Sequence, residues 1–238
     1  MTDILRIWSY LAEGQLLWLT ATLIAYLIGD ACFRLSGAKP YVNPVLISMV
    51  LLSILLQTTD TSYATYFEGA QFIHFMLGPA TVALAVPLWR NWALVKSAAM
   101  PLLAALVVGS LVAMGSAVAI GAAMGLDEAL LLSLVPKSAT SPVALGVSEA
   151  IGGLPTLTVA LVLVTGVVGA VVTTPLNNAL RIRDYRGRGF ATGVAAHGIG
   201  TARAFQVHGT AGAFAAVGMV MNAIATALFA PLFVQLFF

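Results

Sequence analysis

Charged side chains are scarce in this sequence. Only 8% of its 238 residues are Asp, Glu, Lys or Arg, while 60% are hydrophobic. A soluble domain carries roughly 25% charged residues, because its surface must face water. In a bilayer an apolar exterior is favourable, provided that the backbone polar groups are hydrogen-bonded within helices. We therefore expect an integral membrane protein without a sizeable water-soluble domain.

Residues for covalent or metal chemistry are also lacking. The one cysteine, Cys32, excludes an intramolecular disulfide and a cysteine-ligated metal cluster, and the three histidines are widely scattered. No nucleophile elbow, phosphate-binding loop or metal-ligand spacing is present. The net charge of +2 is too small to indicate nucleic-acid binding. We expect neither an enzyme nor a bound cofactor.

What the sequence does contain is a series of long apolar segments rich in Leu, Ala and Val. They lack the period-2 alternation of membrane β-strands, so we expect helices. In chain order the clear segments are residues 15–33, 42–57, 69–89, 101–125, 154–180 and 210–237. The polar stretch 58–68 is interpreted as a loop. A crossing helix needs about 20 such residues, and most of these segments are long enough.

Two further segments are interrupted. Residues 130–135 and 143–151 flank the motif Pro136-Lys137-Ser138-Ala139-Thr140-Ser141-Pro142, and residues 190–206 are rich in glycine. Proline removes a backbone donor and prevents a continuous helix. Unwound backbone at membrane depth is tolerated only where protein or a water-filled cavity shelters it. Both segments are therefore candidates for a binding site.

Basic loops indicate how the first interrupted segment is arranged. The positive-inside rule places the loops 34–39 and 90–96 in the cytoplasm. If residues 128–153 crossed the membrane completely, the loop 181–188 with its four arginines would lie outside. If they dip in and return, that loop lies inside. We favour the re-entrant arrangement, and a full crossing with a broken middle is the alternative.

Short similarities suggest an internal repeat. Asn43-Pro44-Val45-Leu46 resembles Ser141-Pro142-Val143-Ala144, and Gly78-Pro79-Ala80-Thr81 resembles Gly198-Ile199-Gly200-Thr201. The second pair is farther apart by roughly one span, which would invert the second copy, as in many transporters. We predict an all-α, polytopic helical membrane protein, with residues 1–238 as a single integral membrane domain. It has six to eight membrane segments with broken or re-entrant helices, and a possible inverted repeat.

Lys137 is the first candidate for substrate binding. It lies between two prolines with Ser138, Thr140 and Ser141 around it. A half-helix that begins near Pro142 would direct its free N–H groups toward a sheltered cavity. An ammonium, three hydroxyls and these N–H groups suit a small anion. The alternative is a surface loop in which Lys137 reaches back to water.

The second candidate is the stretch His197-Gly198-Ile199-Gly200-Thr201-Ala202-Arg203. Its glycines let the backbone approach a ligand closely, and a guanidinium fits a carboxylate. We expect Lys137 and Arg203 to face one cavity and share the substrate carboxylate, with His197 carrying a proton. The alternatives are an Arg203 that caps a helix end at the headgroups and a His197 that only binds a neighbour.

Weaker candidates lie in the first half of the chain. Asn43 and Thr81 could donate side-chain hydrogen bonds at the breaks of the first repeat, although helix capping explains them nearly as well. His74 has Gln71 at helical spacing, and we interpret it as a buried, hydrogen-bonded histidine.

Four of these stretches, in order, resemble the LrgB/CidB family across nearly the whole chain. They are Asn43-Pro44-Val45-Leu46, the stretch from Leu77 to Leu88, the Pro136–Pro142 motif, and His197-Gly198-Ile199-Gly200-Thr201-Ala202. The resemblance implies a multi-pass protein of the plasma (inner) membrane. It also implies a partner, an LrgA/CidA-like small membrane subunit, and a homo- or hetero-oligomer in the lipid bilayer, without nucleic acid.

The resemblance implies two functions. Some family members look like carriers of small carboxylates, as does the LrgB-like half of the plastid glycolate/glycerate translocator. Others were described as holin/antiholin-like regulators of murein hydrolase activity and autolysis. The interrupted segments favour transport, and with the resemblance they lead us to expect a secondary transporter subunit for small monocarboxylates of the glycolate, glycerate, pyruvate or lactate type, coupled to protons. The holin/antiholin-like regulator is the alternative.

Overall fold

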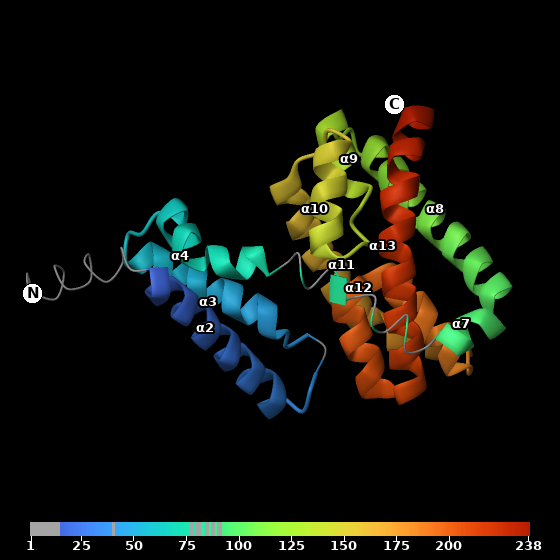
Figure 1. The fold of residues 1–238 in the computed structure, drawn as a ribbon, viewed down its shortest axis with the longest axis horizontal. Helices are drawn as coiled ribbons and strands as arrows, with labels where there is room; N and C mark the ends of the chain where they lie inside the picture. Colours follow the sequence, from blue (N-terminus) through green and yellow to red (C-terminus); the bar gives the residue numbers. More distant parts are fainter. Residues whose placement is uncertain are drawn as a thin grey trace, which may run out of the picture. The chain divides into compact units, whose positions relative to one another are not determined.

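The computed structural model describes residues 15–39, 41–76, 79, 82–83, 86, 89 and 92–238. The chain divides into two compact units, unit 1 (Met1–Ala80) and unit 2 (Thr81–Phe238), and each is described by itself. Every regular element in the described part of the chain is an α-helix, which confirms the all-α class (Figure 1). The single domain 1–238 stays a prediction.

The helices follow the apolar segments closely. Unit 1 contains α2 (Gln15–Leu35), α3 (Pro44–Thr58) and α4 (Tyr63–Phe75). The described helices of unit 2 are α7 (Trp92–Ser97), α8 (Ala99–Ala123), α9 (Glu128–Leu134), α10 (Ser141–Ala150), α11 (Pro155–Ala179), α12 (Tyr185–Val207) and α13 (Gly209–Phe237). The loop expected at 58–68 is shorter than predicted. Ser62 accepts a hydrogen bond from the Thr65 N–H and so starts α4.

Among the described residues, four helices are long and apolar enough to cross a membrane, namely α2, α8, α11 and α13. Their surfaces agree with this role. On α11, for example, Val164, Val168 and Val172 are exposed at a spacing of four residues and form an apolar stripe. The chain is a helical membrane protein with these four candidate spans. The larger count of six to eight segments stays a prediction.

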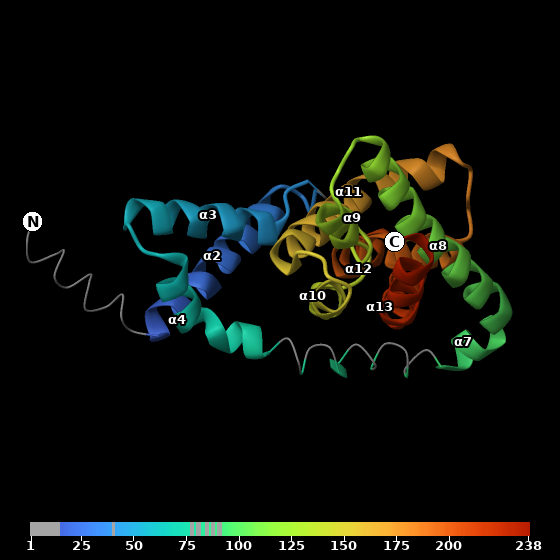
Figure 2. The same cartoon turned by 90° about the horizontal axis from the view of Figure 1, so that it is seen from above.

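Unit 1 is held together by packing of α2 against α3 and α4 (Figure 2). Trp18 on α2 is buried and meets the ring of Tyr66 on α4 edge-on, with 5.9 Å between centroids. Gly29 allows α3 to start close by, because a side chain there would collide with the backbone of Pro44. These contacts fix three helices around a small core.

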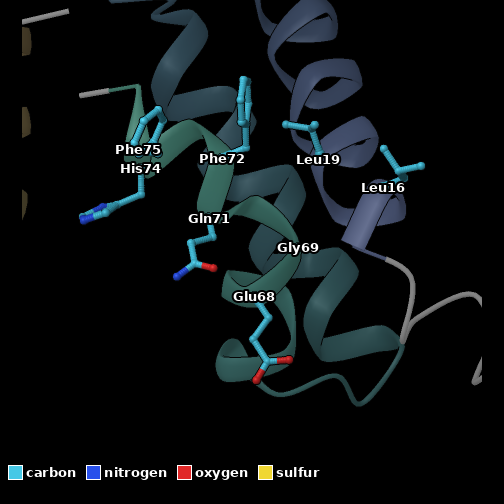
Figure 3. Close-up of a pocket in the computed structure, with 8 residues that line it drawn as sticks. All are labelled: Leu16, Leu19, Glu68, Gly69, Gln71, Phe72, His74 and Phe75. Atoms are coloured by element: carbon cyan, nitrogen blue, oxygen red, sulfur yellow. The ribbon is translucent and has the colours of Figure 1, made fainter. Parts of the chain in front are cut away.

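A hollow of about 570 Å³ opens between α2 and α4 of unit 1. Figure 3 shows Glu68, Gln71 and His74 on α4, and Leu16 and Leu19 on α2. The prediction of a buried His74 is wrong. The residue is exposed and its ring lies edge-on to Phe67, because α4 turns this face away from its neighbours.

Unit 2 has a core at each end of the pair α8 and α13. At one end Leu102 packs with Phe190 and Phe214. At the other end Met114 and Phe233 pack with neighbours from α9 and α10. Phe229 on α13 packs against both clusters and so joins them.

Candidate functional site

The helices α9 and α10 form a hairpin that returns to the level at which it starts. The Ser133 hydroxyl, before the turn, accepts a hydrogen bond of 2.7 Å from the Leu154 N–H, after it. The Thr158 hydroxyl donates to the Ser133 carbonyl at 3.1 Å and lies 2.7 Å from the Ser148 hydroxyl. Entry and exit are therefore adjacent, with Pro136–Pro142 in the turn.

The helix α12 also folds back on itself. Its backbone is non-helical at Ala196 (φ −130°, ψ 19°) and His197 (φ 40°, ψ −135°), so it consists of two half-helices. The rings of Tyr185 and His208, at its two ends, stack with centroids 4.2 Å apart. A side chain on Gly200 would collide with Ala196. The prediction for residues 190–206 was incomplete, since we expected a segment interrupted by glycines but not a hairpin.

The two hairpins enter unit 2 from opposite ends of α11. The α9–α10 hairpin is bonded to Thr158 in the first turn of α11. The α12 hairpin is bonded to its last turns, where Arg188 Nη2 donates to Asn178 Oδ1 at 2.7 Å. Figure 1 agrees, with α9 and α10 at the end of unit 2 where α13 terminates and α12 at the opposite end. A rise of 1.5 Å per residue puts roughly 30 Å between these contacts.

The tips of the hairpins meet at Val162 on α11. Ala139 and Ala144, from the first tip, pack against the Val162 side chain. His197 Nε2, from the second tip, lies 2.8 Å from the Val162 carbonyl oxygen. Gly166 admits the imidazole, because a side chain there would collide with it. The two motifs singled out in the sequence are thus brought to one place.

The helix α13 joins both tips from the other side. Asn222 Nδ2 donates to the Ser138 carbonyl at 3.1 Å, and Asn222 Oδ1 accepts from the Ser110 hydroxyl on α8 at 2.7 Å. One turn earlier, the Met219 sulfur lies 3.9 Å from the Thr201 hydroxyl. Asn222, Ser110 and Met219 were not among the predicted site residues. The signal was available for Asn222, an amide in the middle of a largely apolar span.

The first tip presents polar groups that the fold leaves partly unused. Lys137 is half-buried and its Nζ donates to the Ser138 hydroxyl at 3.3 Å. Thr140 precedes α10, and its hydroxyl is buried without a hydrogen-bond partner. Ser141 is the first residue of α10. An ammonium, a hydroxyl without a partner and a helix N-terminus are therefore close together in the chain.

At the second tip the polar side chains mainly serve the fold. His197 is 4% exposed, and the Thr201 hydroxyl donates to its carbonyl at 2.7 Å. Gly198 is exposed, whereas Gly200 is buried at the fold-back. The N-terminus of the returning half-helix begins at Gly198 and lies at the tip, as does the N-terminus of α10.

Arg203 lies away from these tips. It lines a small cavity of about 20 Å³ together with Arg188, Thr173, Thr174 and Thr192, and Lys137 is not among the residues around it. Its Nη1 donates to Gln206 Oε1 at 3.1 Å. The returning half-helix carries Arg203 back toward the end where α12 began. That Lys137 and Arg203 bind one substrate carboxylate together stays a prediction.

The remaining candidates belong to the first half of the chain. Asn43 Oδ1 accepts from the N–H groups of Val45 and Leu46 at 2.9 and 3.2 Å, as expected of the cap of α3. Thr81 lies outside the described residues. Pro44 and Pro142 each stand in the first turn of a helix, as the proposed repeat requires. Its second pair of motifs includes undescribed residues, so the inverted repeat stays a prediction.

Charges separate toward the two ends of unit 2. The start of α8 and the arginine loop line one hollow of about 540 Å³, which includes Ala98 and Arg186. Arg186 pairs with Asp184 at 2.9 Å, and its side-chain hydrogen bonds lower the pKa of that carboxyl. At the other end, Gly121 of α8 packs against Leu131 of α9, near the acidic Asp127. The start of α8 and the arginine loop therefore share one end of unit 2.

Comparison with known proteins gives consistent matches. The LrgB-like family matches residues 22–236. YxaC of Bacillus subtilis (strain 168) is 37% identical over 198 residues, which cover 83% of this chain and 86% of that protein. The antiholin-like protein LrgB of Bacillus mycoides (strain KBAB4) is 30% identical over 215 residues, which cover 90% of this chain and 94% of that protein. No solved structure matches.

Proposed function

Because this chain belongs to the LrgB-like family, as its motifs suggested, we propose that it is a subunit of a secondary transporter for small monocarboxylates. One observation carries the proposal, namely that two hairpins enter from opposite ends of α11 and both contact Val162 with their tips. Discontinuous helices that meet inside the membrane are where many carriers bind substrate.

The electrostatics of the tips favour an anion. Both α10 and the returning half of α12 begin at a tip, so both direct their N-termini toward the middle of unit 2. The first N–H groups of a helix have no partner within the helix, and the aligned peptide dipoles put partial positive charge there. Two such ends at one place attract a carboxylate.

Side chains add specificity to these N-termini. The unpartnered Thr140 hydroxyl and the half-buried Lys137 ammonium can both donate to a carboxylate oxygen. Ser141 adds a second hydroxyl at the start of α10. His197, held at Val162, would carry the coupled proton. The set suits a glycolate, glycerate, pyruvate or lactate type of acid, since it offers many donors and no fixed negative charge.

The proposal includes a membrane topology, a cellular membrane and partner proteins. Both hairpins are re-entrant segments, and the arginine loop faces the cytoplasm of a cell bounded by the plasma (inner) membrane. An LrgA/CidA-like small subunit and other copies of the chain are the proposed partners. The chain acts without a cofactor and is not an enzyme.

The test is uptake of labelled glycolate, pyruvate and lactate into liposomes that contain the purified chain, with and without an LrgA-like subunit. We expect saturable uptake of at least one acid that rises as the external pH falls and collapses with a protonophore. Uptake that ignores pH and requires sodium would remove the proton from the proposal. No uptake of any acid in either preparation would refute the carrier.

The antiholin-like role is the second candidate, and the names of the relatives support it better than they support transport. A protein of that kind restrains murein hydrolases and so delays lysis of the cell. The discriminating experiment deletes the gene and measures autolysis together with carboxylate uptake. Faster autolysis with unchanged uptake favours the regulator. In that case the normal rate of autolysis would be restored by expressing the chain again, but not by a carrier of unrelated fold.

A further inference from the structure

The base of the α12 hairpin contains a cavity that is lined by two arginines. Arg188 comes from the outgoing half of α12 and Arg203 from the returning half. Three threonines, Thr173, Thr174 and Thr192, complete its polar wall, and the remaining lining is alanine and valine. No carboxylate is among the described residues that line it. The charged side chains that line the cavity are therefore both cations, and the Thr192 hydroxyl donates to the Arg188 carbonyl at 2.7 Å.

Neither arginine has an acidic partner in the described part of the chain. Arg188 Nη2 donates to the neutral groups Asn178 Oδ1 at 2.7 Å and the Thr174 carbonyl at 3.4 Å. Arg203 Nη1 donates to Gln206 Oε1 at 3.1 Å. The ion pairs within the described ranges join Arg34 to Asp30 and Arg186 to Asp184. The two charges at the cavity are thus not neutralised by the chain.

The Nε atom of Arg203 indicates that this arrangement suits a ligand. The atom is buried and has no hydrogen-bond partner. A buried donor without a partner is costly, and like charges that face one small space repel each other. An anion in the cavity offsets both costs. The volume of about 20 Å³ admits something the size of a water molecule, so it excludes a phosphate ester or a lipid headgroup.

We propose that this cavity is a second anion site, which binds a small monovalent anion through Arg188 and Arg203. The ligand is either a chloride ion or the carboxylate end of a small acid. The site is distinct from the hairpin tips, because Arg203 is six residues beyond His197, roughly 9 Å along the returning half-helix. It stands between the tips and the arginine loop, and it does not depend on whether the chain transports.

The experiment measures chloride binding by chlorine NMR on the full chain, purified in detergent with methanesulfonate, which has no carboxylate, as the other anion. Chloride that exchanges between the protein and the solution broadens the chlorine resonance. For the parent, this added line width should saturate as the chloride concentration rises. Arg203→Gln and Arg188→Gln should each weaken the apparent affinity at least about tenfold, since each removes a charged hydrogen bond. The matched control is Arg183→Gln in the exposed loop, which should titrate like the parent.

Further arms identify the ligand and guard against misfolding. Glycolate that displaces the chloride signal identifies the carboxylate as a ligand, and a signal unchanged by glycolate identifies the inorganic ion. If Arg203→Gln does not fold, Arg203→Lys keeps the charge but lacks Nε, and its affinity should still fall. An absent excess line width in the parent overturns the site. So does an affinity unchanged in folded variants of both arginines. Failed transport with intact chloride binding contradicts only the carrier.

Discussion

The side-chain amide of Asn222 on α13 donates a hydrogen bond of 3.1 Å to the backbone carbonyl of Ser138 at the tip of the α9–α10 hairpin. The same side chain accepts from the Ser110 hydroxyl on α8 at 2.7 Å. Asn222 and Ser110 are each 1% exposed. One amide therefore ties the turn of a hairpin to two spanning helices and holds the unwound backbone in place.

Asn222→Leu should destabilise unit 2 by about 1–2 kcal/mol, because it leaves two buried polar groups without a partner. The measurement is unfolding of the purified chain in detergent, followed by circular dichroism. The matched control is Asn177→Leu, which removes only a local bond to the Thr173 carbonyl within α11. Equal losses in the two variants would contradict a special role of Asn222.

Gly193→Ala should destabilise the chain by about 1–3 kcal/mol, as expected of overpacking. A methyl group there collides with the backbone of Ala215 on α13, and backbone cannot move aside as a side chain can. Gly187→Ala is the control, since a Cβ at Gly187 meets open space. In an exposed helical position alanine is favoured by up to about 1 kcal/mol, so the two changes should have opposite signs. The same unfolding experiment tests this, and like signs would refute the close packing of α12 on α13.

The positions of the helix breaks could be predicted from local chemistry. Pro136 and Pro142 remove two backbone donors within one short polar stretch, which favours the turn before α10. A single proline in an apolar segment is a weaker signal, since Pro175 and Pro231 lie inside α11 and α13. The long apolar segments likewise indicated α8, α11 and α13, because length and composition alone decide whether a helix can span a bilayer.

The reversal of α12 was not predictable in the same way. Glycines permit either close helix packing or a turn, and tertiary contacts decide between them. Here Gly166 and Gly169 of α11 admit His197 and Ala196, so the chain turns there. The returning half-helix carries Arg203 to the cavity that Arg188 also lines, and the sequence alone did not indicate this pairing.

Topology gives a third prediction. In a chain whose Cys32 is replaced by serine, a cysteine at Gly187 should resist an impermeant thiol reagent added outside intact cells. A cysteine at Asp127 should react readily. The reason is that the arginine loop and the start of α8 share one end of unit 2, and clustered arginines stay in the cytoplasm. Permeabilised cells supply the control for reactivity. Ready labelling at Gly187 in intact cells would reverse the orientation.

The last prediction separates binding from folding at the two tips. The Thr140 hydroxyl has no partner in the fold, whereas the Thr201 hydroxyl donates to the His197 carbonyl at 2.7 Å. Thr140→Val should therefore stabilise the fold slightly, since it removes a buried hydroxyl without a partner. It should weaken the apparent affinity for the best substrate roughly twofold to tenfold, the equivalent of one neutral hydrogen bond. Thr201→Val should instead destabilise the chain by about 1 kcal/mol.

Lys137→Gln extends this test, because it removes a charge and keeps a donor. A charged hydrogen bond is stronger, so the affinity should fall by roughly tenfold to a hundredfold while the helical content is retained. Uptake into liposomes measures the affinity, and circular dichroism in detergent measures the fold. If Lys137→Gln and Thr140→Val both transport like the parent, the anion does not bind at the first tip. Lys137 would then be an interfacial anchor, whose ammonium reaches the headgroups as long cationic side chains do near helix ends.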